Sequence, residues 1–235
     1  VDKLKEVATE CEAAGGGGGG GGVKARVVPL DLAKDAATVE AAAKSVGDID
    51  VVFSNAGVGF RGDVAGTSHE THEMVMRTNF ESAAVITRVV LPGMVARASD
   101  TSTCHLVAVS SVQAFFGQKM RSSYAASKHA LRAFMDSTRA ELGPKSNVKV
   151  TTVMPGYIKT GHSVAALNAD GSKAGVADAN SQKGEDPTKL ANKILDGVAT
   201  GKSEMVTAPL NARLAIVLRV LAPEFTFWFF AKKKE

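Results

Sequence analysis

The chain is poor in cysteine and in aromatic residues, and each shortage argues against some classes of function. Its 235 residues include only two cysteines, Cys11 and Cys104, which form no metal-binding or disulfide pattern. A reducing compartment is therefore the default expectation. Aromatic residues make up 6% of the chain and are not interleaved with basic residues. This composition argues against a nucleic-acid partner, whose binding surface would carry a basic stripe.

The sequence also lacks a metal-ligand cluster. His69 and His72 lie close together in a segment that we interpret as the solvated start of a helix, and no group of further ligands joins them. We therefore predict no metal site. The net charge of +4 comes in large part from Lys232, Lys233 and Lys234 at the C-terminus. With 45% hydrophobic and 22% charged residues, the chain suits one globular domain with a proper core.

The N-terminal part contains no strand followed by a spaced glycine turn. The chain starts at Val1 with a helix-like run, and eight consecutive glycines follow at residues 15–22. We interpret these glycines as a flexible loop, because an unbroken run cannot hold regular structure. A phosphate-binding loop spaces its glycines and leads into a helix, whereas this run leads toward a strand-like segment. We expect the chain to be a fragment of a longer protein.

From residue 25 onward, strand-like and helix-like stretches alternate. The expected strands are residues 25–30, 49–54, 105–110, 148–154 and 204–207. The expected helices are residues 36–46, 72–97 (broken or bent near Pro92 and Gly93), 124–142 and 188–198, the last opened by Asp186 as N-cap and Pro187. This alternation predicts an α/β fold with a doubly wound parallel sheet over residues 1–208. Ligands of such sheets bind at the carboxyl ends of the strands.

Three residues around one of these strand ends have a chemical relation to one another. Tyr124 and Lys128 are four residues apart at the start of a predicted helix, so they share a face. A neighbouring ammonium favours the phenolate and lowers a tyrosine pKa that is ordinarily about 10. Ser111 lies thirteen residues before Tyr124, at the end of a predicted strand. Together these residues indicate a tyrosine that exchanges a proton near neutral pH, with a hydroxyl beside it.

This pattern of serine, tyrosine and lysine resembles the short-chain dehydrogenase/reductase family, and the resemblance extends from about Ala25 to Thr207. It implies a Rossmann-like fold and a hydride transfer between a nicotinamide cofactor and a carbonyl or secondary alcohol. The matching catalytic residues are Ser111, Tyr124 and Lys128. The family also places an asparagine at the position of Asn79, where it holds a helix kink and a proton-relay water; a satisfied core asparagine is the alternative.

The resemblance also assigns cofactor-binding positions. Asn55, Ala56 and Gly57 match the segment that lines the adenine and ribose side, although such a segment can also be a plain turn. The acidic position that contacts adenine matches Asp31, followed by Leu32. Tyr124, Lys128 and the turn from Pro155 to Thr160 match the nicotinamide side. The cofactor-binding residues of that turn are Pro155, Gly156, Ile158 and Thr160. Residues 161–184 are small and polar, and we expect a mobile substrate lid there.

The C-terminal segment, residues 209–235, departs from a plain soluble enzyme. It is apolar and aromatic, but two arginines, a proline and a glutamate interrupt it, so a membrane-spanning helix is not expected. We predict an apolar helix that lies on a membrane surface, with packing on the chain's own domain or across a dimer as the alternative. The segment resembles the membrane-associated member 7 branch of the family, and its lysines resemble an endoplasmic-reticulum retrieval signal. If this segment does not bind a membrane, we expect the protein to be cytoplasmic.

The first two strands of the family fold and its glycine-rich turn have no counterpart in the sequence. That turn binds the cofactor pyrophosphate, so we expect residues 1–235 alone to bind the cofactor poorly. For the intact protein, the resemblance to the member 7 branch implies NADP, with NAD as the alternative, and a lipophilic substrate such as a steroid or retinoid. A homo-oligomer through residues 71–97 and 124–142 is also implied. Two other functions would also fit this pattern: a cofactor-deficient binding or scaffold protein, and a nucleoside-sugar epimerase. An epimerase, however, usually needs a larger C-terminal substrate domain.

Overall fold

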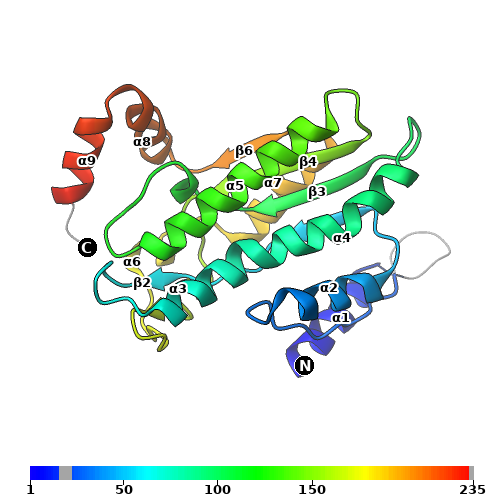
Figure 1. The fold of residues 1–235 in the computed structure, drawn as a ribbon, viewed down its shortest axis with the longest axis horizontal. Helices are drawn as coiled ribbons and strands as arrows, with labels where there is room; N and C mark the ends of the chain where they lie inside the picture. Colours follow the sequence, from blue (N-terminus) through cyan, green and yellow to red (C-terminus); the bar gives the residue numbers. More distant parts are fainter. Residues whose placement is uncertain (16–22, 233–235) are drawn as a thin grey trace.

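A parallel β-sheet organises the computed structural model, which describes residues 1–15 and 23–232. Four strands lie in the order β1-β3-β4-β6, and every neighbouring pair is parallel (Figure 1). Their bounds are Val51–Ser54 for β1, Cys104–Val109 for β3, Val148–Pro155 for β4 and Glu204–Thr207 for β6. The predicted α/β fold with a Rossmann-like parallel sheet is therefore confirmed. Parallel strands align their carboxyl ends at one edge, which is where a ligand site is expected.

Helices cover both faces of this sheet. The helices are α1 (Asp2–Gly15), α2 (Ala36–Val46), α3 (His69–Met76), α4 (Ser82–Arg97), α5 (Ser122–Leu142), α6 (Ala179–Gln182), α7 (Pro187–Ala199), α8 (Leu210–Leu221) and α9 (Pro223–Lys232). Figure 1 shows α4 and α5 side by side across one face, with α7 behind the sheet. The expected N-cap of α7 is present, because the Asp186 carboxylate accepts a hydrogen bond from the Lys189 N–H.

Alternating side chains of β3 divide the core between the two faces. Leu106 and Ala108 pack with α4 and α5, where Met94 and Met135 are also fully buried. Val107 points to the other face and packs with α7. Burial of large apolar side chains such as these stabilises the fold by roughly 1.5–3 kcal/mol each. Because both faces of β3 are buried, the strand is packed on both sides up to the point where the loop with Ser111 begins.

Two sequence-based predictions about secondary structure are wrong. Residues 25–30 form no strand, because no strand of the described chain lies beside them and a strand needs a hydrogen-bonded neighbour. The predicted long helix is interrupted at residues 77–81, not at Pro92. A π-helical turn, η1 (Arg77–Glu81), joins α3 to α4, and α4 runs through Pro92 and Gly93 without a break. Proline removes only one backbone donor, and here the surrounding hydrogen bonds keep the helix intact.

The predicted lid, residues 161–184, is more ordered than a loop. It contains a short 3₁₀ turn, η3 (Gly161–Ser163), then strand β5 (Leu167–Asn168) and α6. Strand β5 pairs in parallel with β2 (Phe60–Arg61), which lies far away in the sequence. An ion pair between Arg121 and Asp178, 3.4 Å apart, also ties this segment to the start of α5. The segment therefore covers the carboxyl edge of the sheet in a defined position.

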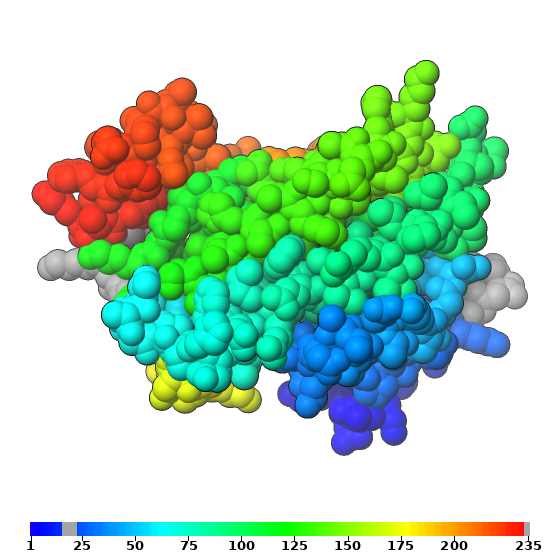
Figure 2. All heavy atoms as spheres, viewed as in Figure 1, coloured from blue at the N-terminus to red at the C-terminus, as the bar shows by residue number. Residues whose placement is uncertain are grey.

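The C-terminal segment forms two short helices, α8 and α9, where one apolar helix was predicted. The second begins at Pro223, whose fixed φ suits the first turn of a new helix. Figure 2 shows both helices projecting from one end of the body. Across residues 1–15 and 23–232, no helix is long and apolar enough to cross a bilayer. Most of the polyglycine run, together with Lys233 and Lys234 at the C-terminus, lies outside the described residues, and two predictions rest in part on these segments.

Candidate active site

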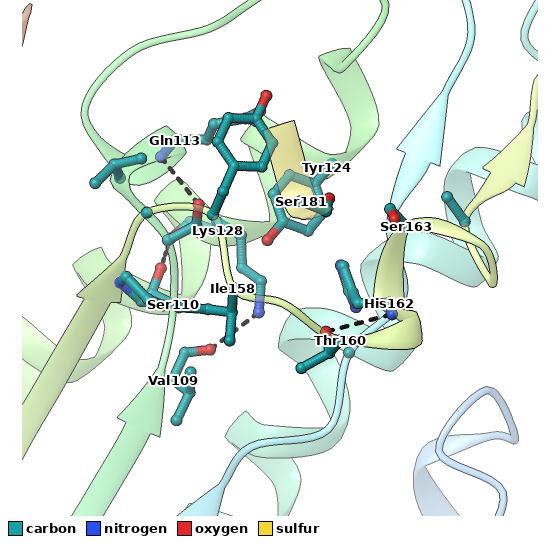
Figure 3. A pocket seen from close by; sticks show the side chains of 18 of the residues that line it. Val109, Ser110, Gln113, Tyr124, Lys128, Ile158, Thr160, His162, Ser163 and Ser181 are labelled. Atoms are coloured by element: carbon teal, nitrogen blue, oxygen red, sulfur yellow. Dashed lines mark hydrogen bonds between the residues drawn. The ribbon is translucent and has the colours of Figure 1, made fainter. Parts of the chain in front are cut away.

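A cleft of roughly 680 Å³ opens at the carboxyl ends of the strands. Its walls come from the ends of β1, β3 and β4, the start of α5 and the lid, as the close-up in Figure 3 shows in part. Ten of the residues predicted from the sequence line it: Asn55, Ala56, Gly57, Ser111, Tyr124, Lys128, Pro155, Gly156, Ile158 and Thr160. Asn79, Asp31 and Leu32 are not among the lining residues. Segments far apart in the sequence thus meet at one cleft.

Ser111 holds a fixed position because it caps a short turn. It directly follows β3 and opens the 3₁₀ turn η2 (Val112–Ala114). Its Oγ accepts a hydrogen bond of 3.2 Å from the backbone N–H of Gln113. The hydroxyl hydrogen can be donated into the cleft, where the Tyr124 hydroxyl lies within its reach, since a hydroxyl donates as well as accepts.

Tyr124 lies in the first turn of α5, with its ring beside the cleft (Figure 3). Burial raises the pKa of Tyr124 above its ordinary value, while a hydrogen bond with the Ser111 side chain acts in the opposite direction. The prediction that Lys128 lowers this pKa is not met in this structure. The Lys128 Nζ is 5.8 Å from the centre of the tyrosine ring, and burial outweighs the other influences. The phenol is therefore protonated at neutral pH.

Lys128 is almost fully buried, with 3% of its surface exposed. Its Nζ donates a hydrogen bond of 3.0 Å to the Val109 carbonyl at the end of β3. Burial lowers the pKa of Lys128 to about 8. An ammonium has three N–H donors, so two remain for groups in the cleft. A Cβ added at Gly57 would lie 3.4 Å from this nitrogen and 3.2 Å from the Asn79 Oδ1, so a larger residue there would press on the asparagine.

Asn79 lies in the π-helical turn η1 and supports the cleft from behind. Its Oδ1 accepts a 2.7 Å hydrogen bond from the Val58 N–H, and its Nδ2 donates to the Val58 carbonyl at 3.0 Å. The same Nδ2 contacts the Ser127 Oγ on α5 at 3.0 Å. One buried amide therefore joins the loop after β1 to the helix that carries Tyr124 and Lys128. Sequence reasoning associated this asparagine with a helix irregularity, and the structure places it inside one.

Several residues of the cleft were not predicted from the sequence. His162 lies on η3, two residues after Thr160, and its ring is 6.0 Å from that of Tyr124, centre to centre. Burial, and then the nearby Lys128 charge, lower the pKa of His162. The ion pair of Arg121 and Asp178 also lines the cleft, as does Arg61. The motif at Pro155–Thr160 predicted that a site lies in this region. Which further side chains line the site depends on how the lid folds, and the sequence motif does not reveal that.

The residues present fit the nicotinamide end of a dinucleotide. The two free donors of Lys128 face a cleft bordered by the small residues Asn55–Gly57, and such donors suit the hydroxyls of a ribose. At the pyrophosphate end the fit is incomplete. In the part of the chain that the structure describes, no strand leads through a glycine-rich turn into a helix, which is the usual pyrophosphate site.

The two histidines noted in the sequence make local contacts within and beside α3. His69 Nε2 lies 3.4 Å from the Glu73 carboxylate, and His72 Nδ1 contacts the Ser123 Oγ at 3.0 Å. Within the described ranges, no group of three histidine, cysteine, aspartate or glutamate side chains could hold a metal ion.

A parallel sheet with a serine, a tyrosine and a lysine converging at its carboxyl edge places the chain among the Rossmann-like α/β proteins. Comparison with known families is more specific. The sequence model of the short chain dehydrogenase family matches residues 1–171. The chain belongs to the short-chain dehydrogenase/reductase family, as its motifs predicted.

Curated relatives include dehydrogenase/reductase SDR family member 7B of Bos taurus, which is 37% identical over 99% of this chain and 70% of the relative. The family protein 7-like of Drosophila melanogaster is 38% identical over 88% of this chain and 63% of that protein. The predicted similarity to the member 7 branch is thus confirmed. The chain spans about two thirds of the length of these relatives.

Solved structures show the same fold. A short chain dehydrogenase/reductase from Burkholderia phymatum, in complex with NAD, has a TM-score of 0.76 at 22% identity, over 95% of this chain and 82% of that one. A metagenomic short-chain oxidoreductase in complex with NADP has a TM-score of 0.65 at 25% identity, over 89% of this chain and 82% of that one.

Proposed function

We propose that the protein is an oxidoreductase that transfers a hydride between a nicotinamide cofactor and a carbonyl compound or secondary alcohol. The convergence of Ser111, Tyr124 and Lys128 on one cleft carries this proposal. Membership of the family supports it, because the family model is that of a dehydrogenase. The chain spans about two thirds of its relatives, so the activity is proposed for the protein together with any residues that precede Val1 in its gene.

In the reductive direction, each side chain has a separate task. The nicotinamide cofactor, when bound, supplies the hydride. Tyr124 donates its proton to the carbonyl oxygen, and the raised pKa that burial gives it keeps that proton in place at neutral pH. Ser111 donates a hydrogen bond to the same oxygen as negative charge develops there. Lys128 holds the ribose hydroxyls with its free donors and adds positive charge beside the site.

Asn79 acts through other groups. Because its amide bonds to Val58 and Ser127, it fixes the loop after β1 relative to α5. The distance between the cofactor-binding segment Asn55–Gly57 and Lys128 depends on that connection. We assign Asn79 the role of a positioning residue and keep the family's proton-relay water as a prediction.

For the cofactor we propose NADP, on the resemblance to the member 7 branch; NAD is the alternative. A lipophilic substrate is supported by the apolar part of the cleft wall, to which Phe60, Ile158, Ala166, Leu190 and Ile194 contribute. Apolar walls with few polar groups are typical of small-molecule sites.

We also propose that α8 and α9 lie on a membrane surface. Leu214, Leu221 and Trp228 are each more than half exposed. Two cationic side chains stack on aromatic rings beside them, since the Arg219 guanidinium is 4.7 Å from the Phe227 ring centre and the Lys232 Nζ is 4.3 Å from that of Trp228. Apolar and aromatic groups next to cations favour an interface with anionic lipids.

A rival function has one observation in its favour. In the described part of the chain no strand leads through a glycine-rich turn directly into a helix, so a cofactor-deficient binding or scaffold protein would also fit. The two are separated by incubating the full-length protein with NADPH or NADH and a panel of aldehydes and ketones, and identifying products by mass spectrometry. Alcohol formation that requires the cofactor supports the oxidoreductase. Absence of both cofactor binding and turnover would favour the scaffold.

A further inference from the structure

One wall of the cleft carries a cationic side chain with no anionic partner. Arg61, on β2, is half-buried and lines the cleft. Its Nη2 donates a hydrogen bond of 3.2 Å to the Ser163 carbonyl of the lid. Among the described residues, no carboxylate forms an ion pair with it. A guanidinium has five N–H donors in a planar fork, so most of its binding capacity is unused.

The neighbouring Arg121 differs from Arg61, because a carboxylate already balances its charge. Arg121 forms an ion pair with Asp178, and both side chains are at most one fifth exposed. Its Nη1 also donates to the Phe60 carbonyl at 3.1 Å. The Gly62 N–H bonds to the Met120 carbonyl, so the backbones that carry the two arginines run side by side. Asp178, the one carboxylate that lines the cleft in the described ranges, is therefore occupied by Arg121 and leaves the charge of Arg61 uncompensated.

Both arginines act on the same part of the cleft. Burial, and then Asp178, raise the pKa of Tyr157, and the Arg121 and Arg61 guanidiniums lie near enough to its hydroxyl to act in the opposite direction. Tyr157 is on the segment after β4, so Arg61 faces the substrate side of the cleft, beside the lid. Taking a charge partly out of water costs free energy unless a counter-charge or hydrogen bonds compensate it. A planar carboxylate matches the guanidinium fork with two parallel hydrogen bonds.

We propose that Arg61 forms an anion subsite that binds a carboxylate of the substrate while its carbonyl group lies at Ser111 and Tyr124. The substrate class is then a carbonyl compound or alcohol with an apolar body and an acidic end. The apolar body packs against the Ile158 and Leu190 side of the cleft. This inference rests on the proposed function, since it assigns the substrate class of the same site.

The test compares para-carboxybenzaldehyde with its methyl ester, which differ at one end only. Binding of each to the full-length protein is measured by titration calorimetry, and reduction by NADPH consumption. The acid should bind more tightly than the ester. In Arg61→Gln, acid affinity should fall about tenfold or more, because charge-assisted hydrogen bonds are lost, while ester affinity should not change. Arg61→Lys should retain part of the preference, which guards against a folding defect.

Arg88→Gln is the matched control, because Arg88 is exposed on α4 and does not line the cleft. It removes the same charge and should leave the ratio of acid to ester affinity unchanged. An equal ratio in wild-type protein and Arg61→Gln would overturn the subsite. Arg61-dependent binding of the acid without any turnover would support the subsite and count against the proposed hydride transfer. Turnover of both compounds without a preference for the acid would support the proposed hydride transfer and overturn the subsite.

Discussion

At the scale of single residues, the chemistry depends on a lysine that is taken out of water. Lys128 is 3% exposed, and its Nζ donates to one backbone carbonyl. Burial disfavours the charged form of the amine, which is why its pKa falls from 10.5 to about 8. The same burial raises the pKa of Tyr124. One environment therefore weakens the hold of Lys128 on its proton and keeps Tyr124 protonated at neutral pH, so the phenol carries a proton to donate but is a weaker acid than a free tyrosine.

This lysine predicts a dependence of stability on pH. Between pH 8 and 10.5 the unfolded chain binds more protons at Lys128 than the folded chain does, so the free energy of unfolding rises with pH. The expected rise over this window is about 3 kcal/mol. Urea unfolding of wild type and Lys128→Met is compared across the window. The difference between their free energies of unfolding reports the contribution of Lys128, because the other titrating groups are common to both proteins.

Lys202→Met serves as the control, because Lys202 is exposed. Its unfolding free energy should follow that of wild type at every pH. A difference between wild type and Lys128→Met that stays constant from pH 8 to 10.5 would contradict the assigned burial of the lysine.

At the scale of secondary-structure elements, the cleft depends on a one-turn irregularity. The π-helical turn η1 places Asn79 where its amide reaches the loop after β1 and helix α5 together. An α-helix that continued without this turn would shift the register of side chains by one position. π-Turns of this kind are frequent at functional sites.

Asn79→Ala should therefore destabilise the protein by about 1–3 kcal/mol, because the half-buried backbone groups of Val58 and the buried Ser127 hydroxyl lose their partner. Urea unfolding measures the loss. Asn147→Ala removes an amide that bonds to Asp100 in an exposed position, and its effect should stay within about 0.5 kcal/mol. Equal effects of the two substitutions would mean that Asn79 does not hold the loop to the helix.

Local patterns in the sequence predicted most of the helices and strands and the grouping of the three central site residues. Ser111, Tyr124 and Lys128 are placed by one strand end and one helix, so their spacing was enough to group them. Residues 25–30 have strand composition, but a strand needs a neighbour, which composition does not reveal. The pairing of β2 with β5 joins residues more than a hundred positions apart, so neither the order of the lid nor Arg61 was foreseen. The direction of the Tyr124 pKa was missed because burial outweighed the charge effect.

At the scale of the whole molecule, the cleft and the C-terminal helices lie close together. The Phe230 ring of α9 stacks on Phe116, in the loop after η2, with ring centres 5.0 Å apart. The outer surface of α8 and α9 remains apolar and exposed. A membrane bound by this surface would place lipophilic substrates near the loop that follows Ser111.

Membrane binding is tested by co-sedimentation with vesicles. The full-length protein should bind vesicles that contain phosphatidylserine more strongly than vesicles of phosphatidylcholine alone, and added salt should weaken that preference. A double variant, Leu221→Glu with Trp228→Glu, should reduce binding at least about tenfold, since it removes exposed apolar contacts. Val64→Glu is the control, because Val64 is 78% exposed and lies outside these helices. Unchanged binding of the double variant would exclude this surface.

The transfer of deuterium to a carbonyl carbon tests the central claim most directly. The full-length protein is incubated with a ketone and NADPH deuterated at the transferred position, and mass spectrometry follows the label into the alcohol. Wild type should transfer the label. Tyr124→Phe should lower the rate by about 10²–10⁴-fold, as expected for loss of a general acid, with cofactor affinity nearly unchanged. A Tyr124→Phe variant that transfers deuterium at the wild-type rate would contradict the account.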